Sequence, residues 1–123
     1  MASEKALMDA IARIESDVNG VIATAVVDLE SGMTLAAKSN RGDFDLTVAS
    51  AYNSELVKQK LKIMKALNLK ASLEDMVLTL TDQIHVIKIM PGGTSFLYLA
   101  ADRGSTNLAI LRTSVAKQTA GLE

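Results

Sequence analysis

Residues 45–68 read DLTVASAYNSELVKQKLKIMKALN, the longest helical pattern in the chain and the stretch that decides its fold. At 100° per residue, its apolar side chains fall on two neighbouring stripes. The first stripe contains Ala49, Tyr52, Leu56, Ile63 and Leu67, and the second contains Leu46, Val57, Leu61 and Met64. Together the stripes span about 200°, whereas a helix lying on its own sheet needs about 100°. The sequence therefore predicts a helix about 36 Å long with more apolar surface than one sheet covers.

The second stripe is the part of this helix that we expect the rest of the chain to leave uncovered. Leaving Val57, Leu61 and Met64 in water would forfeit several kcal/mol at about 25 cal/mol per Å². An apolar patch of this kind usually marks an interaction site. A second copy of the chain is the simplest partner, because one patch then serves both copies. The alternative is that other helices of the same chain cover the stripe.

The remaining side of the long helix is basic. Lys58, Lys62 and Lys65 are aligned, and Lys70 follows shortly after the helix. Two interpretations stay open. The lysines form a solvated helix face, or they steer the protein toward an acidic partner, which would make binding sensitive to salt.

The sequence on either side of the long helix predicts two more helices and five strands. The helices span 3–18 and 106–119, and the strands span 21–28, 33–38, 76–81, 83–90 and 94–101. Tight turns between the last three strands predict an antiparallel meander. Several strands are apolar on both faces, so the sheet needs cover on both sides. We therefore predict an α/β (α+β) fold of order α-β-β-α-β-β-β-α, with two helices on one face and one on the other.

Composition excludes several classes of protein. The 123 residues fit a single domain over 1–123, with no cysteine and only one histidine, His85, so we expect no metal site and no cofactor. A net charge of −1 and 3% aromatic residues argue against nucleic-acid binding. No apolar run approaches the ~20 residues of a membrane span. Since residues 1–5 lack the layout of a signal peptide, we expect a cytoplasmic protein.

No group of residues forms a recognisable catalytic motif. Asp28, Glu30 and Asp43 lie in turn-like sequence, where solvated carboxylates are the better interpretation than an acid pair. His85 lies in a strand between two apolar residues, and the sequence identifies no nucleophile or orienting group for it. The glycines do not form a phosphate loop. We therefore predict that the protein is not an enzyme.

The chain resembles the roadblock family, the family of the roadblock-type dynein light chain. Three marks occur in the family's order: the hairpin sequence VVDLESG at 26–32, the small residues VASA at 48–51 that open the long helix, and NLAILR at 107–112 in the last helix. Ser31 departs from the acidic residue often found before the hairpin glycine. The resemblance implies a five-stranded antiparallel sheet, with the first and last helices on one face and the long helix on the other. It also implies pairing through the long helix and the third strand.

From these patterns we predict a non-enzymatic homodimeric adaptor or regulator. The resemblance implies a small Ras-like GTPase as a possible partner. The predicted dimer interface comprises Leu46, Val57, Leu61, Met64, Met76, Leu78 and Leu80, and the predicted partner-binding residues are Ala49, Ser50, Asn53, Lys58, Lys62 and Lys65. The alternative is a small-ligand sensor domain, since mixed helix–sheet folds of this size often enclose a pocket.

Overall fold

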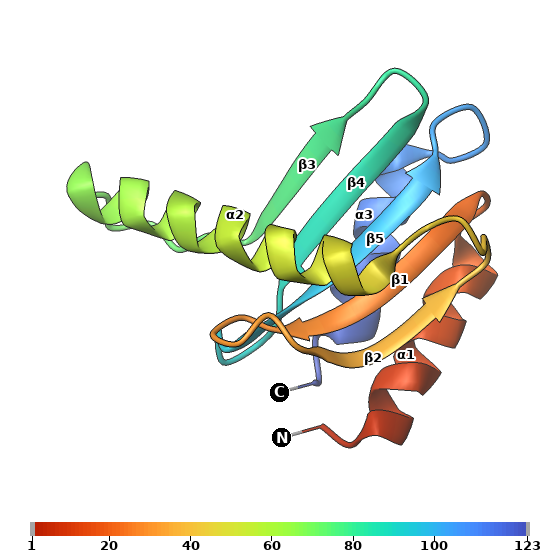
Figure 1. Cartoon of the computed structure of the whole chain (residues 1–123), viewed down its shortest axis with the longest axis horizontal. Helices are drawn as coiled ribbons and strands as arrows, with labels where there is room; N and C mark the ends of the chain where they lie inside the picture. The colour runs from red at the N-terminus through yellow and green to blue at the C-terminus, as the bar shows by residue number, and fades with distance from the viewer. Residues whose placement is uncertain (1, 123) are drawn as a thin grey trace.

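The computed structural model describes residues 2–122 and contains one five-stranded sheet and three helices (Figure 1). The elements are α1 (Glu4–Asp17), β1 (Val21–Asp28), β2 (Thr34–Ser39), α2 (Leu46–Ala66), β3 (Asp75–Thr79), β4 (Gln83–Ile89), β5 (Ser95–Asp102) and α3 (Leu108–Thr119). The strands lie in the order β2-β1-β5-β4-β3, and every neighbouring pair is antiparallel. The predicted element order and fold class are confirmed.

The central strands β1 and β5 are buried on both faces because they alternate between two apolar clusters. On one face, Val26 and Leu97 face α1 and α3. On the other face, Val27, Phe96 and Tyr98 belong to the cluster beneath α2. This arrangement explains why both strands read as almost continuous apolar runs.

Helices α1 and α3 lie together on one face of the sheet. Ser3 caps α1 by accepting a hydrogen bond from the Ala6 amide, and Asn107 caps α3 by accepting one from the Ile110 amide. The apolar stripe of α1 and residues Leu111 and Val115 of α3 enter one cluster. Among residues 2–122, no helix combines the length and apolar character required to cross a membrane.

Helix α2 lies alone on the opposite face and packs mainly on β1 and β2. Asp45 caps α2 by accepting a hydrogen bond from the Val48 amide at 3.1 Å. The faces taken by the three helices agree with the prediction.

Several predicted boundaries differ from the structure by one or two residues, and two of these differences have a clear cause. The strand predicted over 76–81 ends at Thr79, because the Leu80 amide donates to the Gln83 carbonyl and closes the turn into β4. The helix predicted over 106–119 begins at Leu108, because Asn107 is its cap.

Gly20 connects α1 to β1 and allows a direct test of this packing. Gly20 (φ +80°) and Gly92 (φ +90°) both adopt left-handed backbone, but a Cβ on Gly20 would lie 2.8 Å from Ser105 Cβ, whereas a Cβ on Gly92 would meet no atom within 4 Å. We expect Gly92→Ala to cost about 1–2 kcal/mol from backbone strain alone. Gly20→Ala should cost about 1–3 kcal/mol more because it overfills a packed contact. Urea denaturation at matched protein concentration measures both, and equal costs would contradict the packing.

Candidate protein interface

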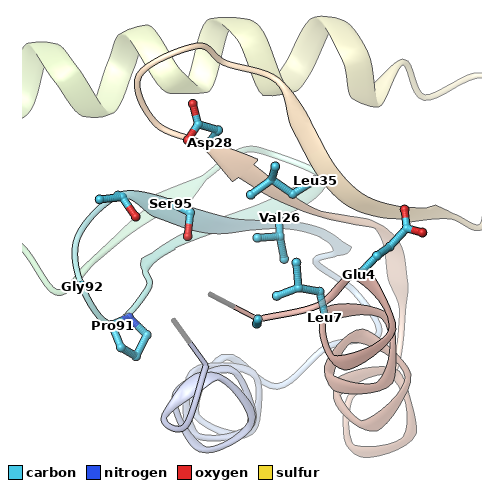
Figure 2. A pocket seen from close by; sticks show the side chains of 10 residues that line it. Glu4, Leu7, Val26, Asp28, Leu35, Pro91, Gly92 and Ser95 are labelled. Atoms are coloured by element: carbon cyan, nitrogen blue, oxygen red, sulfur yellow. The ribbon is translucent and has the colours of Figure 1, made fainter.

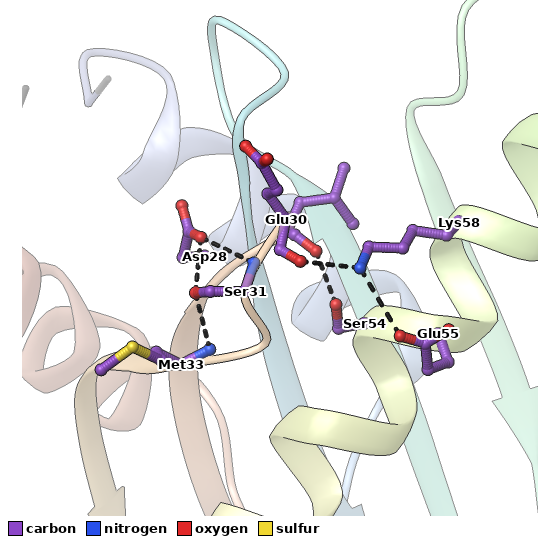
Figure 3. Close-up of polar contacts among 8 residues, drawn as sticks. Asp28, Glu30, Ser31, Met33, Ser54, Glu55 and Lys58 are labelled. Carbon is purple, nitrogen blue, oxygen red and sulfur yellow. Dashed lines mark hydrogen bonds and ion pairs between the residues drawn. The ribbon is translucent and has the colours of Figure 1, made fainter.

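Small residues and one lysine attach α2 to the β1–β2 hairpin (Figure 3). Ser54 Oγ donates to the Leu29 carbonyl at 2.6 Å, and Lys58 Nζ donates to the Glu30 carbonyl at 2.7 Å. Thr34 Oγ1 donates to Ser50 Oγ at 3.1 Å. These contacts hold the N-terminal half of the helix over the β1–β2 side of the sheet.

The hairpin itself is organised by Asp28. Its Oδ2 accepts hydrogen bonds from the Ser31 amide at 2.9 Å and the Ser31 hydroxyl at 2.6 Å (Figure 3). The Ser31 hydroxyl also accepts from the Met33 amide. The bonds from the Ser31 side chain and backbone hold the pKa of Asp28 below its usual value. Asp28 is therefore a carboxylate that stabilises a turn.

The exposed apolar stripe of α2 is the first of the two predicted stripes, whereas the second was expected to be uncovered. Val57 is 0% exposed, and Leu46 packs on the same cluster beneath the helix. Tyr52 is 75% exposed and Leu67 is 62% exposed. The prediction that Val57 faces outward is therefore wrong, because it fills the core beneath the helix.

We define the lateral stripe as Tyr52, Leu56, Ile63 and Leu67. On a helical wheel these side chains lie about 80–140° to one side of Val57, and the predicted lysines lie about 80–140° to the other side. The lysine side carries Ser54, whose bond to Leu29 faces the hairpin. The side of the lateral stripe carries Asn53, whose side chain lies near the hydroxyl of Tyr98 on β5. Since β4 and β3 lie beyond β5, the lateral stripe faces their side of the sheet.

Strands β3 and β4 have little cover on the α2 side of the sheet. We call their residues on this face the open strip: Met76, Leu78, Leu80 and His85. Met76, Leu78 and His85 are half-buried, and Leu80 is exposed. Figure 1 shows the C-terminal half of α2 extending past the edge of the sheet. Consequently Leu61 is exposed although it points toward the sheet side of the helix.

His85 lies in a hydrogen-bonded group at the margin of the open strip. Gln83 Oε1 lies 2.7 Å from Nε2, and the Tyr98 hydroxyl lies 3.2 Å from Nδ1. The side-chain oxygen Oε1 of Gln83 can only accept a hydrogen bond, so the ring proton of His85 lies on Nε2. Nδ1 is then free to accept from the Tyr98 hydroxyl. Burial lowers the pKa of His85, partly offset by Asp82, and burial raises the pKa of Tyr98 to about 12 despite the nearby Asn53 side chain.

Strand β3 is an edge strand, and half of its backbone groups point away from the sheet. The amides of Leu80 and Ile89 donate to the carbonyls of Gln83 and Glu74, respectively. Because bonded pairs alternate in an antiparallel ladder, the amides and carbonyls of Asp75, Val77 and Thr79 face outward. This edge can accept another strand.

The lysines concentrate the positive charge of the chain. Residues 56–73 contain five lysines and no acidic residue, so this segment has a net charge of +5. The rest of the chain therefore carries −6, which gives the total net charge of −1. Lys62 and Lys65 are exposed, whereas Lys58 is anchored to the hairpin. The predicted basic patch therefore exists as a surface feature.

The fold is shared with several solved structures, although no protein-family profile and no curated protein matches the sequence. Myxococcus xanthus MglB has 14% identity and a TM-score of 0.85 over 98% of this chain and 86% of its own. A structure described as MglB with tetrameric arrangement has 15% identity and a TM-score of 0.82 over 97% and 85%. The Roadblock/LC7 domain from Streptomyces avermitilis has 14% identity and a TM-score of 0.77 over 90% and 89%.

The chain has the Roadblock/LC7 fold. The resemblance seen in the sequence is confirmed at the level of fold.

Within this Roadblock/LC7 fold, the small residues at the start of α2 serve the chain itself. Ser50 is fully buried against Thr34, and Ala49 packs on the cluster beneath the helix. The prediction that Ser50 contacts a partner is therefore wrong, because the close approach it permits is to the chain's own hairpin. Asn53 likewise turns inward toward Tyr98.

Among the predicted interface residues, Leu61, Met64, Met76, Leu78 and Leu80 remain available at or beside the open strip. The lateral stripe is not among the residues that the sequence predicted for an interface. The signal that could have done so is the i, i+4 pair Ser50 and Ser54, whose small side chains mark the side of α2 that lies close to backbone.

The histidine generates a prediction for stability. Because the pKa of His85 is lowered from 6.5 in the folded state, the unfolded state binds more protons as pH falls. The contribution is fully present above about pH 6.5 and is lost progressively below it. We expect the free energy of unfolding from urea titrations to decline between about pH 7 and 5.5, and to decline less in His85→Gln. Identical profiles for both proteins would contradict this environment.

Proposed function

We propose that the protein is a non-enzymatic homodimeric regulator that acts in the cytoplasm by binding other proteins, with a small Ras-like GTPase as the partner class. The observation that carries the proposal is the combination of a projecting apolar helix, an open strip and an unpaired strand edge in one region of the chain. The GTPase partner class rests on the family resemblance.

The dimensions of the open strip favour a second copy of α2 as its occupant. Two strands spaced about 4.8 Å apart present a strip about 10 Å wide. A helix with its side chains has a diameter of about 10 Å. A partner helix lying on the open strip would have the lateral stripe of this chain's α2 along one side and Leu78 beneath it.

The same patch can serve both copies. Each chain has one projecting helix end and one open strip, so a two-fold axis can place each end on the other copy's strip. The two β3 edges can then pair across the axis through the outward groups of Val77 and Thr79. The related structure with a tetrameric arrangement is consistent with self-association of this fold.

A dimer of this kind would leave the lysines free. The lysines lie on the hairpin side of α2, opposite the lateral stripe, so they flank the helix pair without facing the partner helix. They are therefore positioned to attract an acidic partner.

Light scattering tests the dimer. We expect wild type to have twice the mass of the 13.1 kDa chain, and Tyr52→Asp or Ile63→Asp to shift the protein toward monomer by placing charge in an apolar contact. Ile110→Asp is the matched control, because Ile110 is 52% exposed on α3 at the other face of the sheet.

Strand pairing can be separated from helix packing by a second variant. Thr79→Pro removes an outward amide without breaking a ladder bond to β4, so it should weaken the dimer while Thr79→Ala does not. Monomeric wild type, or equal effects of Ile63→Asp and Ile110→Asp, would refute the proposed pairing.

Binding of a GTPase is tested with the small Ras-like GTPases of the same organism, each loaded with GDP or a GTP analogue. We expect the protein to associate with one nucleotide state of the GTPase. At low salt, the association rate constant should be several-fold lower for Lys62→Glu/Lys65→Glu than for wild type, and this difference should vanish at high salt. Lys117→Glu on α3 is the control for each single variant, Lys62→Glu and Lys65→Glu, because it makes the same change in charge. Stopped-flow kinetics measures the rates, and failure of every GTPase to bind would remove the partner class while leaving the dimer intact.

A further inference from the structure

A cavity of about 440 Å³ opens on the face of the sheet that carries α1 and α3 (Figure 2). It lies between the start of α1, the end of β1, the start of β2 and the turn joining β4 to β5. Its volume falls in the range of small-molecule sites. The open strip lies on the other face of the sheet, so this cavity is independent of the proposed dimer.

The floor of the cavity is apolar. Leu7, Val26 and Leu35 belong to or pack on the cluster beneath α1 and α3, and Figure 2 places Leu7 and Val26 close together at its centre. Pro91 adds apolar surface at the side. This floor can cover a short alkyl chain.

Ser95 provides a polar group with unused hydrogen-bonding capacity. It is only 7% exposed, and its hydroxyl points into the cavity in Figure 2. Its carbonyl accepts a hydrogen bond from the Met90 amide at 2.9 Å, but its hydroxyl makes no hydrogen bond within residues 2–122. A hydroxyl that lines the cavity and has no partner among these residues can hydrogen-bond to a polar ligand atom.

Asp28 and Ser95 form a pair across the β1–β5 ladder. Residues directly opposite each other place their side chains on the same face of the sheet, so the Cβ atoms of Asp28 and Ser95 are neighbours. Both Ser31 bonds go to Oδ2 of Asp28, which leaves Oδ1 available. Glu4 adds a second carboxylate at the opposite side of the rim, and the ten lining residues include no lysine or arginine.

We propose that this cavity binds a primary alkylammonium group, with the cation held by Asp28 and Ser95 and the alkyl chain lying on Leu7 and Val26. The negative rim selects a cation, the hydroxyl accepts one N–H, and the apolar floor selects carbon chains over hydrated inorganic ions. A free aliphatic amine and the side chain of a lysine share this chemistry.

Chemical-shift titration of the full chain tests the site with three probes of equal chain length: n-butylammonium chloride, butan-1-ol and sodium butyrate. We expect butylammonium to bind about five- to tenfold more tightly than butan-1-ol, with butyrate weakest, because only the ammonium is attracted to the rim. The largest shifts should occur at Leu7, Val26, Asp28 and Ser95. Equal binding of butan-1-ol and butylammonium would overturn the proposal, as would shifts confined to other regions or no binding by any probe.

Two variants assign the polar contacts. We expect Asp28→Asn to weaken butylammonium about three- to tenfold and Ser95→Ala about two- to fivefold, with the affinity for butan-1-ol nearly unchanged. Ser31→Ala is the control for Asp28→Asn, because it removes the hydroxyl bond to the carboxylate but keeps the amide bond and the charge. Wild-type affinity in both Asp28→Asn and Ser95→Ala would overturn the proposal.

Nα-acetyl-lysine methylamide distinguishes the two sources of the group. If it binds at least as well as butylammonium, the site accommodates a lysine of a polypeptide. If only butylammonium binds, the site is selective for free amines. Either result supports recognition of an alkylammonium.

Discussion

The close approach of α2 to the β1–β2 hairpin is the constraint on which the rest of the structure depends. Ser50 and Ser54 are small enough to bring the helix against the hairpin, and their hydroxyls bond to Thr34 and Leu29. The helix is thereby held to one side of a sheet about 20–24 Å wide. A single helix about 10 Å in diameter cannot cover that width from an off-centre position. The open strip is the direct geometric consequence.

The two faces of the sheet differ because one helix covers the first and two helices cover the second. Helices α1 and α3 together span about 20 Å, so they close their face except near the ends of the strands. A cavity of small-molecule size remains there, beside Asp28 and Ser95. The α2 face instead leaves an opening as wide as a helix. The same sheet therefore presents surfaces suited to ligands of very different size.

Periodicity and turn chemistry were sufficient to predict the element order, and the family resemblance added the face taken by each helix. They could not decide which stripe of α2 faces the sheet, because both stripes are similarly apolar. That choice depends on bonds such as Ser54 to Leu29, whose partners are 25 residues apart in sequence. The cavity was equally hidden, because the neighbourhood of Asp28 and Ser95 follows only from the register of β1 against β5.

Polar side chains beside the open strip affect the free energy of covering it with an apolar partner. Burying an unpaired polar group costs about 1–3 kcal/mol, which would oppose association. Here Tyr98, His85 and Gln83 hydrogen-bond to one another across β5 and β4. Because both ring nitrogens of His85 and the hydroxyl of Tyr98 already have partners within the chain, covering them leaves these groups paired. Burial lowers the pKa of His85, which favours its neutral ring, so covering the ring at neutral pH does not bury a charge. These hydrogen bonds give the margin of the open strip polar character and lower the cost of burying it.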